Sequence, residues 1–475
     1  MPTYYVRNDG SSTKDNATNP ANASSSMSVS TFNASTFSPG DVIYFSSRGG
    51  DITTAITLVS SGSSGAQIIY SGEENYTPTI TAAGGLNQNG CSYVTIKQFN
   101  YECLQGETGF NFTGSAVGVV TEDLHVDGVS NQAFQHLGTV QVDHYRATSI
   151  NCGDEGLSMH DSPTVRVFNC SFSGLSGANW VGSGILELYD SVFMSESANR
   201  LSIEPAATVY HLTAKNCVFI ESIGMSHRGP DFSASGEVFF YNCVFINLGS
   251  SDFYLLLRST LDATRLINCV FYNGSISSSV VFNQRTDGIN KNNIFHTTTT
   301  GSGKAYYYNY NVDNTVYYAS GSTYYGSTYS TADPLFVDPT NGDFHLQGSS
   351  PVLSISGFDA SSYFTTDIDG DPRINWNIGV DEYTCDIIAN VSVGSIYVTQ
   401  YPALVSGSCE VTASVSSIVL VNYAVENVGN VSVSVGTEEI YVTQYGVAVA
   451  SNALANGLVV VTFSGVTPCK IIFTN

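Results

Sequence analysis

Charged residues are scarce in this sequence, and residues that favour helices rarely run together. Asp, Glu, Lys and Arg make up 12% of the 475 residues, and stretches rich in Ala, Leu, Glu and Lys are almost absent. The chain instead contains 29 Tyr, 25 Phe and 44 Gly, beside runs of Val, Ile, Ser, Thr and Asn. This composition argues against a helical protein and favours an all-β fold.

Long apolar runs and a basic leader segment are also missing. No window holds 18 consecutive apolar residues, and Met1 leads directly into Pro2-Thr3-Tyr4. We therefore expect a soluble protein that does not insert into a membrane. We also expect that a secretory signal was removed, or that the protein leaves its cell by another route, such as lysis by a virus.

Basic residues are few as well. Sixteen Lys and Arg stand against 40 Asp and Glu, a formal net charge of -24. This charge repels a phosphate backbone or an anionic membrane surface, so we expect no nucleic-acid partner. An acidic polysaccharide would need a local basic patch to overcome the same field, whereas neutral sugars meet no such barrier.

A short motif of Asn, Cys, any residue and Phe recurs through the middle of the chain. The residues two and four positions before the Asn are mostly apolar and alternate with polar ones, which is the period of a strand with one buried face. Neighbouring copies lie 18 to 26 residues apart, as expected for one coil of a three-stranded parallel β-solenoid. The copies begin at Asn169, Asn216, Asn242 and Asn268, with weaker ones at Asn151, Asp190 and Asn292.

Each residue type of the motif has a place in this solenoid. Asn suits the left-handed conformation of a tight corner, and its amide can bond to the Asn one coil away, so we predict an Asn ladder. Cys and Phe, two residues apart, point into the core. We expect the motif cysteines to be small apolar fillers rather than disulfides. The alternative, a series of antiparallel hairpins, requires Gly-rich two-residue turns that are missing.

Residues near both ends of this region strengthen the prediction. Phe37–Phe45 reads FSPGDVIYF, Asp333–Pro339 reads DPLFVDP, and Ile378–Tyr383 reads IGVDEY. These segments resemble the opening and closing coils of the right-handed parallel β-helix proteins of the pectate-lyase-like superfamily. The resemblance covers about residues 1–383 and implies a right-handed, single-stranded β-helix. The superfamily includes polysaccharide lyases, glycoside hydrolases, adhesins and bacteriophage tailspikes, so the resemblance implies a fold more firmly than an activity.

We expect three parts: an N-terminal capping segment at 1–50, a parallel β-helix at 51–383, and a small C-terminal β domain at 384–475. The last part lacks the coil motif but contains a duplication. Its sequence IYVTQY at 396–401 recurs 44 residues later at 440–445, which predicts two similar halves. Such a domain can cover the strand edges at the end of the solenoid, or form the trimerisation or host-contact end of a viral fibre.

Candidate site residues can be sought by their offset from the repeat Asn, because equal offsets stack about 5 Å apart. Glu204 and Asp231 lie 14 and 15 residues after Asp190 and Asn216, so we predict a catalytic carboxylate pair on neighbouring coils. For substrate binding we predict an aromatic platform and cations: Trp180, Arg200, His227, Arg228 and Arg258. The alternatives are ordinary surface ion pairs and, for Trp180, a core position.

Two further acidic groups stand out. Asp154-Glu155-Gly156 follows the motif at Asn151, where several hydrolases of the resembling superfamily carry acidic residues; a polar corner is the alternative. Asp367, Asp369 and Asp371 alternate like the start of a calcium loop, but the downstream Glu of such a loop is absent. We interpret this run as a turn and predict neither a metal site nor a cofactor.

Three functions fit these observations. The first is a virion surface protein, a tailspike or tail fibre, that binds host cell-surface polysaccharide and, if it is an enzyme, depolymerises it as a hydrolase or lyase. As a virion component it would be a homotrimer that contacts other virion proteins. The second is a secreted bacterial polysaccharide lyase or glycoside hydrolase, and the third is a structural fibre or adhesin without catalysis.

Overall fold

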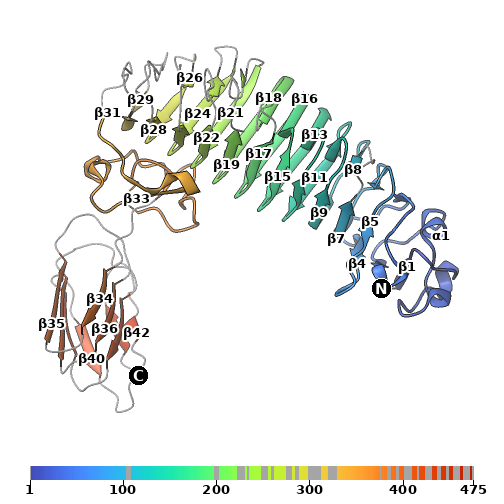
Figure 1. Ribbon diagram of the computed structural model, residues 1–475, viewed down its shortest axis with the longest axis horizontal. Helices are drawn as coiled ribbons and strands as arrows, with labels where there is room; N and C mark the ends of the chain where they lie inside the picture. The colour runs from blue at the N-terminus through green and yellow to red at the C-terminus, as the bar shows by residue number, and fades with distance from the viewer. Residues whose placement is uncertain are drawn as a thin grey trace. The chain divides into compact units, whose positions relative to one another are not determined.

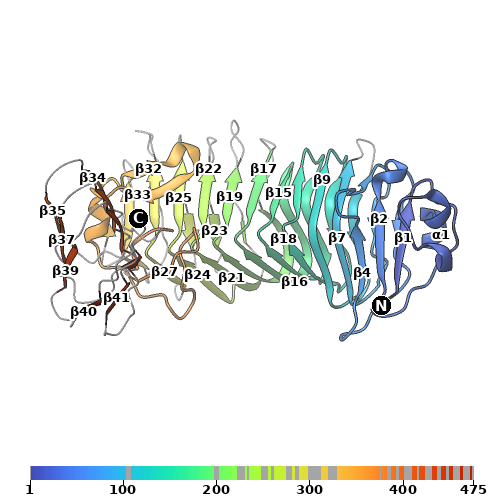
Figure 2. The ribbon, with the colours of Figure 1, turned by 90° about the horizontal axis from the view of Figure 1, so that it is seen from below.

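The computed structural model comprises two compact units, and the solenoid strands run in sequence order in Figures 1 and 2. The first contains 1–334, 360–370 and 378–380; the second contains 335–359, 371–377 and 381–475. The residues that the structure describes are 2–102, 108–196, 203–221, 231–232, 235–247, 255–257, 261–273, 281–283, 288–297, 312–318, 329–374, 376–381, 387–391, 395–400, 409–413, 417–422, 431–435, 440–444, 449–452, 460–463 and 471–472.

The first unit is the all-β, parallel β-helix that the sequence predicts. Its strands pair in parallel with the equivalent strands one coil away, which gives three faces. The first face, just before the repeat Asn, contains β1 (Thr3–Arg7), β2 (Val42–Ser46), β4 (Ile68–Gly72), β11 (Gln141–Tyr145), β14 (Thr164–Phe168), β21 (Ser235–Tyr241), β24 (Ala263–Ile267), β27 (Ile289–Lys291) and β29 (Val312–Asp313).

The second face follows the repeat Asn and carries the Cys-x-Phe part of the motif. It contains β5 (Thr79–Ile80), β12 (Thr148–Ile150), β15 (Ser171–Gly174), β17 (Val192–Ser195), β19 (Val218–Glu221), β22 (Val244–Asn247), β25 (Val270–Asn273), β28 (Ile294–Thr297), β30 (Thr315–Tyr318) and β31 (Tyr329–Ser330). Two long strands, β7 (Val94–Glu102) and β9 (Val119–Asp127), continue from the first face onto the second.

The third face completes each coil. It contains β3 (Ile56–Thr57), β6 (Leu86–Asn87), β8 (Thr108–Phe112), β10 (Gln132–His136) and β13 (Glu155–Asp161). It continues in the N-terminal parts of β16 (Ser176–Tyr189) and β18 (Ile203–Lys215), whose C-terminal parts belong to the first face. A separate three-stranded parallel sheet follows, made of β20 (Asp231–Phe232), β23 (Leu255–Leu257) and β26 (Val281–Asn283).

The predicted Asn ladder is present at the corner between the first and second faces. Its residues have positive φ, from 50° at Asp190 to 58° at Asn292, which Asn tolerates better than most residues. The amide of Asn216 donates to Asp190 at 2.9 Å, and that of Asn242 donates to Asn216 at 2.8 Å. Asn292 donates to Asn268 at 3.0 Å. The ladder therefore ties neighbouring coils together.

The weak motif copy at Asn151 does not belong to this ladder. Tyr145 pairs with Phe168, so Arg146, with φ 54°, occupies the corner position equivalent to Asn169. Asn151 lies at the next corner, after β12, and also has positive φ. An Asn-Cys pair suits either corner because both need a left-handed residue before a buried one. The coil that precedes Asn169 is thus 23 residues long rather than 18.

The motif side chains fill the core as predicted. The rings of Phe172, Phe193, Phe219, Phe245, Phe271 and Phe295 stack from coil to coil with centroids 4.6–5.7 Å apart. Cys170, Cys217, Cys243 and Cys269 are buried free thiols, and burial raises the pKa of Cys170 to about 11. Each fully buried Phe contributes roughly 1.5–3 kcal/mol, so this stack is a main source of stability.

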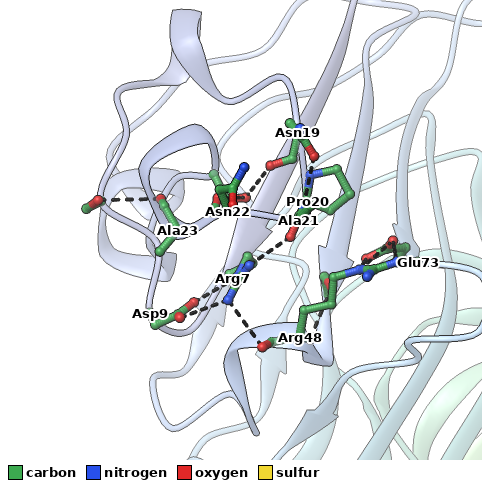
Figure 3. A network of polar contacts seen from close by, with 12 residues as sticks. Arg7, Asp9, Asn19, Pro20, Ala21, Asn22, Ala23, Arg48 and Glu73 are labelled. Carbon is green, nitrogen blue, oxygen red and sulfur yellow. Dashed lines mark hydrogen bonds and ion pairs between the residues drawn. The ribbon is translucent and has the colours of Figure 1, made fainter.

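The N-terminal segment covers the first coil. Its elements are α1 (Val29–Asn33) and the 3-10 turns η1 (Lys14–Asn16), η2 (Ala23–Ser25) and η3 (Ser47–Gly49). The Arg7 guanidinium, shown in Figure 3, donates to both carboxylate oxygens of Asp9 at 2.8 Å and to the carbonyl oxygens of Pro20 and Arg48. β1 pairs with β2, and β2 pairs with β4. The strands of the solenoid therefore begin before residue 51.

The second unit begins with an antiparallel pair, β32 (Phe336–Asp338) and β33 (Asp343–Leu346), with the 3-10 turns η4 (Pro339–Asn341) and η5 (Pro351–Ser354). Its later strands form two parallel sheets and one hairpin. They are β34 (Ile387–Val391), β36 (Cys409–Ala413), β38 (Val431–Val435) and β42 (Ile471–Ile472); β35 (Ser395–Gln400), β37 (Ser417–Asn422) and β39 (Ile440–Gln444); and β40 (Val449–Asn452) with β41 (Val460–Phe463).

The prediction that residues after 383 lack a coil pattern is wrong. Ile396 pairs with Ile418, and Ile418 pairs with Ile440, so parallel strands recur every 22 residues. The 44-residue duplication spans two such intervals. The middle copy, IVLVNY at 418–423, differs enough from IYVTQY to hide the shorter period. In the described residues, no helix is long and apolar enough to cross a membrane.

Candidate functional site

The structure places only some of the predicted site residues. Arg200, His227, Arg228 and Arg258 lie outside the described residues. Glu204 belongs to β18 and Asp231 to β20, but nothing is described of either side chain. The two strands belong to different sheets, so among the described pairings Glu204 and Asp231 are not register partners. A catalytic pair of these two residues therefore stays a prediction.

Trp180 lies in the core rather than on a sugar-binding surface. Its side chain is 1% exposed, and its register partner Met159 is also buried. Strand residues alternate between the two faces of a sheet, and Ala178 and Trp180 take the inner positions of β16. The predicted role of Trp180 in sugar binding is therefore wrong, because its ring has no exposed face.

The strongest described site is the acidic pair Asp154 and Glu155. Glu155 begins β13 on the third face and is only 3% exposed. The Asn179 amide, on the next coil, donates to Oε1 of Glu155 at 2.9 Å, whereas Oε2 is buried without a hydrogen-bond partner. The Gln132 amide, on the preceding coil, lies 3.4 Å from Oδ2 of Asp154. A buried carboxyl oxygen without a partner is costly, so it suggests a role beyond packing.

The surroundings of Glu155 favour its neutral form. Burial raises the pKa of the Glu155 carboxyl above its ordinary value, the amides of Asn179 and Gln132 lower it by less, and the neighbouring Asp154 adds to the rise. A carboxyl group whose pKa is raised holds a proton closer to neutral pH, as a general acid must. The arrangement can therefore donate a proton to a leaving oxygen.

Glycines let the backbone close tightly around this pair. A Cβ on Gly156 would lie 2.7 Å from Oγ of Ser149, and one on Gly174 would lie 2.7 Å from the carbonyl oxygen of Asp154. Neither position has room for a side chain. The Gly that follows Asp154-Glu155 in the sequence thus has a packing role that holds Glu155 at the start of its strand.

A row of polar residues runs along the third face through this site. We call it the face row: Asn87, Asn111, Gln135, Ser158, Asn179 and Glu204 are successive register partners, one per coil. The residues just before them in the described strands form a matching inner row, from Leu86 through Phe110 to Ala178, that is buried in the core. By strand alternation the face row lies on the outer side of the sheet, where Asn111, Gln135 and Asn179 are half-buried and Ser158 is fully buried.

Asp367, Asp369 and Asp371 match the predicted turn. The backbone N–H of Asp369 donates to Oδ1 of Asp367 at 3.1 Å, and Gly370 has φ 90°. A carboxylate that accepts a backbone hydrogen bond two residues ahead is an Asx turn. This bond accounts for the turn at Asp367.

Comparison with known proteins finds only distant structural similarity. No protein-family model matches the chain, and no curated protein matches it in sequence. The crystal structure of pectate lyase Pel9A is similar over 80% of this chain and 96% of that protein, with 15% identity and a TM-score of 0.44. The PL6 family alginate lyase AlyGC is similar over 86% of this chain and 69% of that protein, with 10% identity and a TM-score of 0.41. The strand pairing itself establishes the parallel β-helix.

Proposed function

We propose that this protein binds polysaccharide on a host cell surface and hydrolyses it, with Glu155 as the proton donor. The observation that carries the proposal is the buried Glu155 carboxyl, held through one oxygen by Asn179 and left without a partner at the other. Substrate hydroxyl groups could form hydrogen bonds with the amides of Gln132 and Asn179 in place of the protein carboxyls. The Glu155 carboxyl would then be free to contact the glycosidic oxygen.

The proposed reaction is the hydrolysis of a glycosidic bond. Glu155 gives its proton to the leaving oxygen as the C–O bond breaks, and a water molecule adds to the sugar carbon while a second carboxylate accepts the proton from that water. Glu204 is our candidate for the second carboxylate. Its Cα pairs with that of Asn179, the residue whose amide holds Glu155, so Glu204 lies one coil beyond Asn179 on the same face.

We propose further that the protein works on a virion surface as a homotrimeric tailspike or tail fibre beside other virion proteins. The stacked, buried free cysteines support assembly in a reducing cell rather than in an oxidising secretory compartment. A solenoid that presents the same face three times would add weak sugar contacts through multivalency. A monomeric mass in solution would favour the secreted enzyme instead.

The test is reducing-end release from a panel of bacterial surface polysaccharides. We expect release by the wild type and loss of at least about 100-fold with Glu155→Gln, because a general acid contributes 10²–10⁴-fold. Glu204→Gln and Asp231→Asn compare the two candidates for the second carboxylate. Glu187→Gln, in the same strand as Asn179 but on the first face, is the matched control.

Three results would overturn the proposal. Full activity of Glu155→Gln would remove Glu155 from the reaction. No release from any polysaccharide, by folded protein that still binds cells, would favour a structural fibre or adhesin. Products with unsaturated ends, seen by their ultraviolet absorbance, would mean a lyase instead of a hydrolase.

A further inference from the structure

The face row has hydrogen-bonding capacity that the protein itself does not use. The side chain of Asn111 forms no hydrogen bond, and its Oδ1 is buried without a partner. Gln135 makes a single long contact, from Nε2 to Oε1 of Gln132 at 3.5 Å. Oδ1 of Asn179 is likewise without a partner, although its Nδ2 holds Glu155. Three half-buried amides with unused hydrogen-bonding capacity are thus in line on this face, although the Oδ1 atoms of Asn111 and Asn179 are themselves covered.

Within the described residues, the strands of the third face are acidic. None of its described strands contains Lys or Arg, whereas they contain Glu155, Asp161 and Glu204. Among the described residues, Arg146 and Arg166 pair with Asp123 and Asp143 at the ladder corner and on the first face. With a net charge of -24 on the whole chain, this face would repel a polymer of uronic acids.

We propose that the face row binds a linear, uncharged polysaccharide that lies along the solenoid axis and leads to Glu155. This inference rests on the proposed function and specifies its substrate class. Successive coils are about 4.8 Å apart, close to the length of one sugar unit, so each amide meets the hydroxyl groups of a new sugar. Amides both donate to and accept from hydroxyl groups, which suits neutral sugars.

The test compares two forms of the same polymer. Acidic bacterial polysaccharides are measured in native form and after carboxyl reduction, which turns each carboxylate into a hydroxymethyl group and keeps the linkages; neutral polysaccharides complete the panel. We expect binding of neutral or carboxyl-reduced polymers at least about 10-fold tighter than binding of the native acidic forms, since ionic repulsion and desolvation are removed.

Two variants locate the binding surface. Gln135→Ala should weaken binding of the neutral polymer by about 5- to 10-fold, the usual effect of losing one or two hydrogen bonds. Gln141→Ala is the matched control, because Gln141 is an exposed Gln six residues later, on the first face of the same coil. Thermal unfolding of both variants checks that they are folded, and Asn111→Ala provides a second test on another coil.

The outcomes separate the inference from the proposed function. Tighter binding or cleavage of a native acidic polymer would overturn the neutral-substrate inference and leave the proposed function standing. Unchanged binding by both Gln135→Ala and Asn111→Ala would remove the face row from the binding surface. Binding to no polymer in either form would overturn the inference and the proposed function together.

Discussion

Two rows of amide side chains run along this solenoid, and they differ in how their hydrogen bonds are used. At the corner, Asn242 donates to Asn216, and Asn292 donates to Asn268, so amides one coil apart bond to each other. On the third face, Asn111 and Gln135 are also one coil apart, yet no hydrogen bond joins their side chains. The same residue types at the same spacing thus behave differently.

The backbone explains the difference. The left-handed corner positions hold each Asn side chain so that it meets the next along the solenoid axis, and Asn242 and Asn268 are fully buried there. Residues in the middle of a strand stand away from the sheet instead. An amide row that satisfies itself stabilises the fold, whereas one that does not is available to a ligand. The predictions below test this distinction.

The largest expected effect concerns Glu155, beside the face row. Glu155→Gln should abolish activity yet raise stability at neutral pH. Because the pKa of Glu155 is raised in the folded state, the unfolded chain loses this proton first, and stability falls as pH rises from the unfolded pKa through the folded one. The gain in melting temperature should therefore vanish in acid. A variant that is less stable at neutral pH would show that Glu155 is structural.

At the corner, Asn242→Ala should cost about 2–4 kcal/mol of unfolding free energy. The change removes a buried hydrogen bond, worth about 1–3 kcal/mol, and places Ala in a left-handed conformation at about 1–2 kcal/mol. Asn242→Gly removes only the first contribution, so it should cost less. Equal losses in chemical unfolding would mean that backbone conformation plays no part in the ladder.

The core below the face row contains two buried histidines in one hydrogen-bonded chain. His136 Nδ1 lies 3.0 Å from the Ser158 carbonyl oxygen, which only accepts, so Nδ1 carries the proton. Nε2 of His136 then accepts from Nε2–H of His144 at 2.8 Å, and Nδ1 of His144 accepts from the Thr121 hydroxyl at 2.6 Å. Only neutral histidines fit this chain.

Acid should therefore destabilise the region around the face row. Burial lowers the pKa of His136 to about 4 and that of His144 well below its ordinary value. Stability is fully present above the unfolded pKa of about 6.5 and is lost as pH falls towards the folded pKa, by on the order of 3 kcal/mol for His136. Melting temperatures between pH 7 and pH 4 measure this loss. His136→Leu with His144→Leu should flatten the profile; an unchanged slope would place its origin elsewhere.

The sequence predicts the β-helix well because its later coils repeat Asn, Cys and Phe at positions where the backbone leaves little choice. Earlier coils have other residues at the same corner, so the strand register of these coils cannot be predicted from the motif. These residues are Gln98, Asp123 and Arg146. The face row begins in those coils. Offsets from the repeat Asn therefore do not reach Asn111 and Gln135.

Trp180 shows a different limit of the sequence. The number of residues from the corner gives the position of a side chain along the coil. It does not say whether that side chain points into the core or outward, because this depends on the conformation of every residue between the corner and that position. Ala178 and Trp180 take inner positions and Asn179 the outer one. The alternation was visible in the sequence only once the pairing of β16 with β13 and β18 was known.

The smallest expected effect is the one that tests the comparison most directly. Asn111→Ala, on the face row, should change the unfolding free energy by no more than about 0.5 kcal/mol, because its side chain forms no hydrogen bond to lose. Removing a buried acceptor without a partner can even stabilise the protein. Chemical unfolding beside Asn242→Ala gives both values under one condition. A loss at Asn111 as large as that at Asn242 would mean that the face row supports the fold as the ladder does, and would leave its amides no surplus for a sugar.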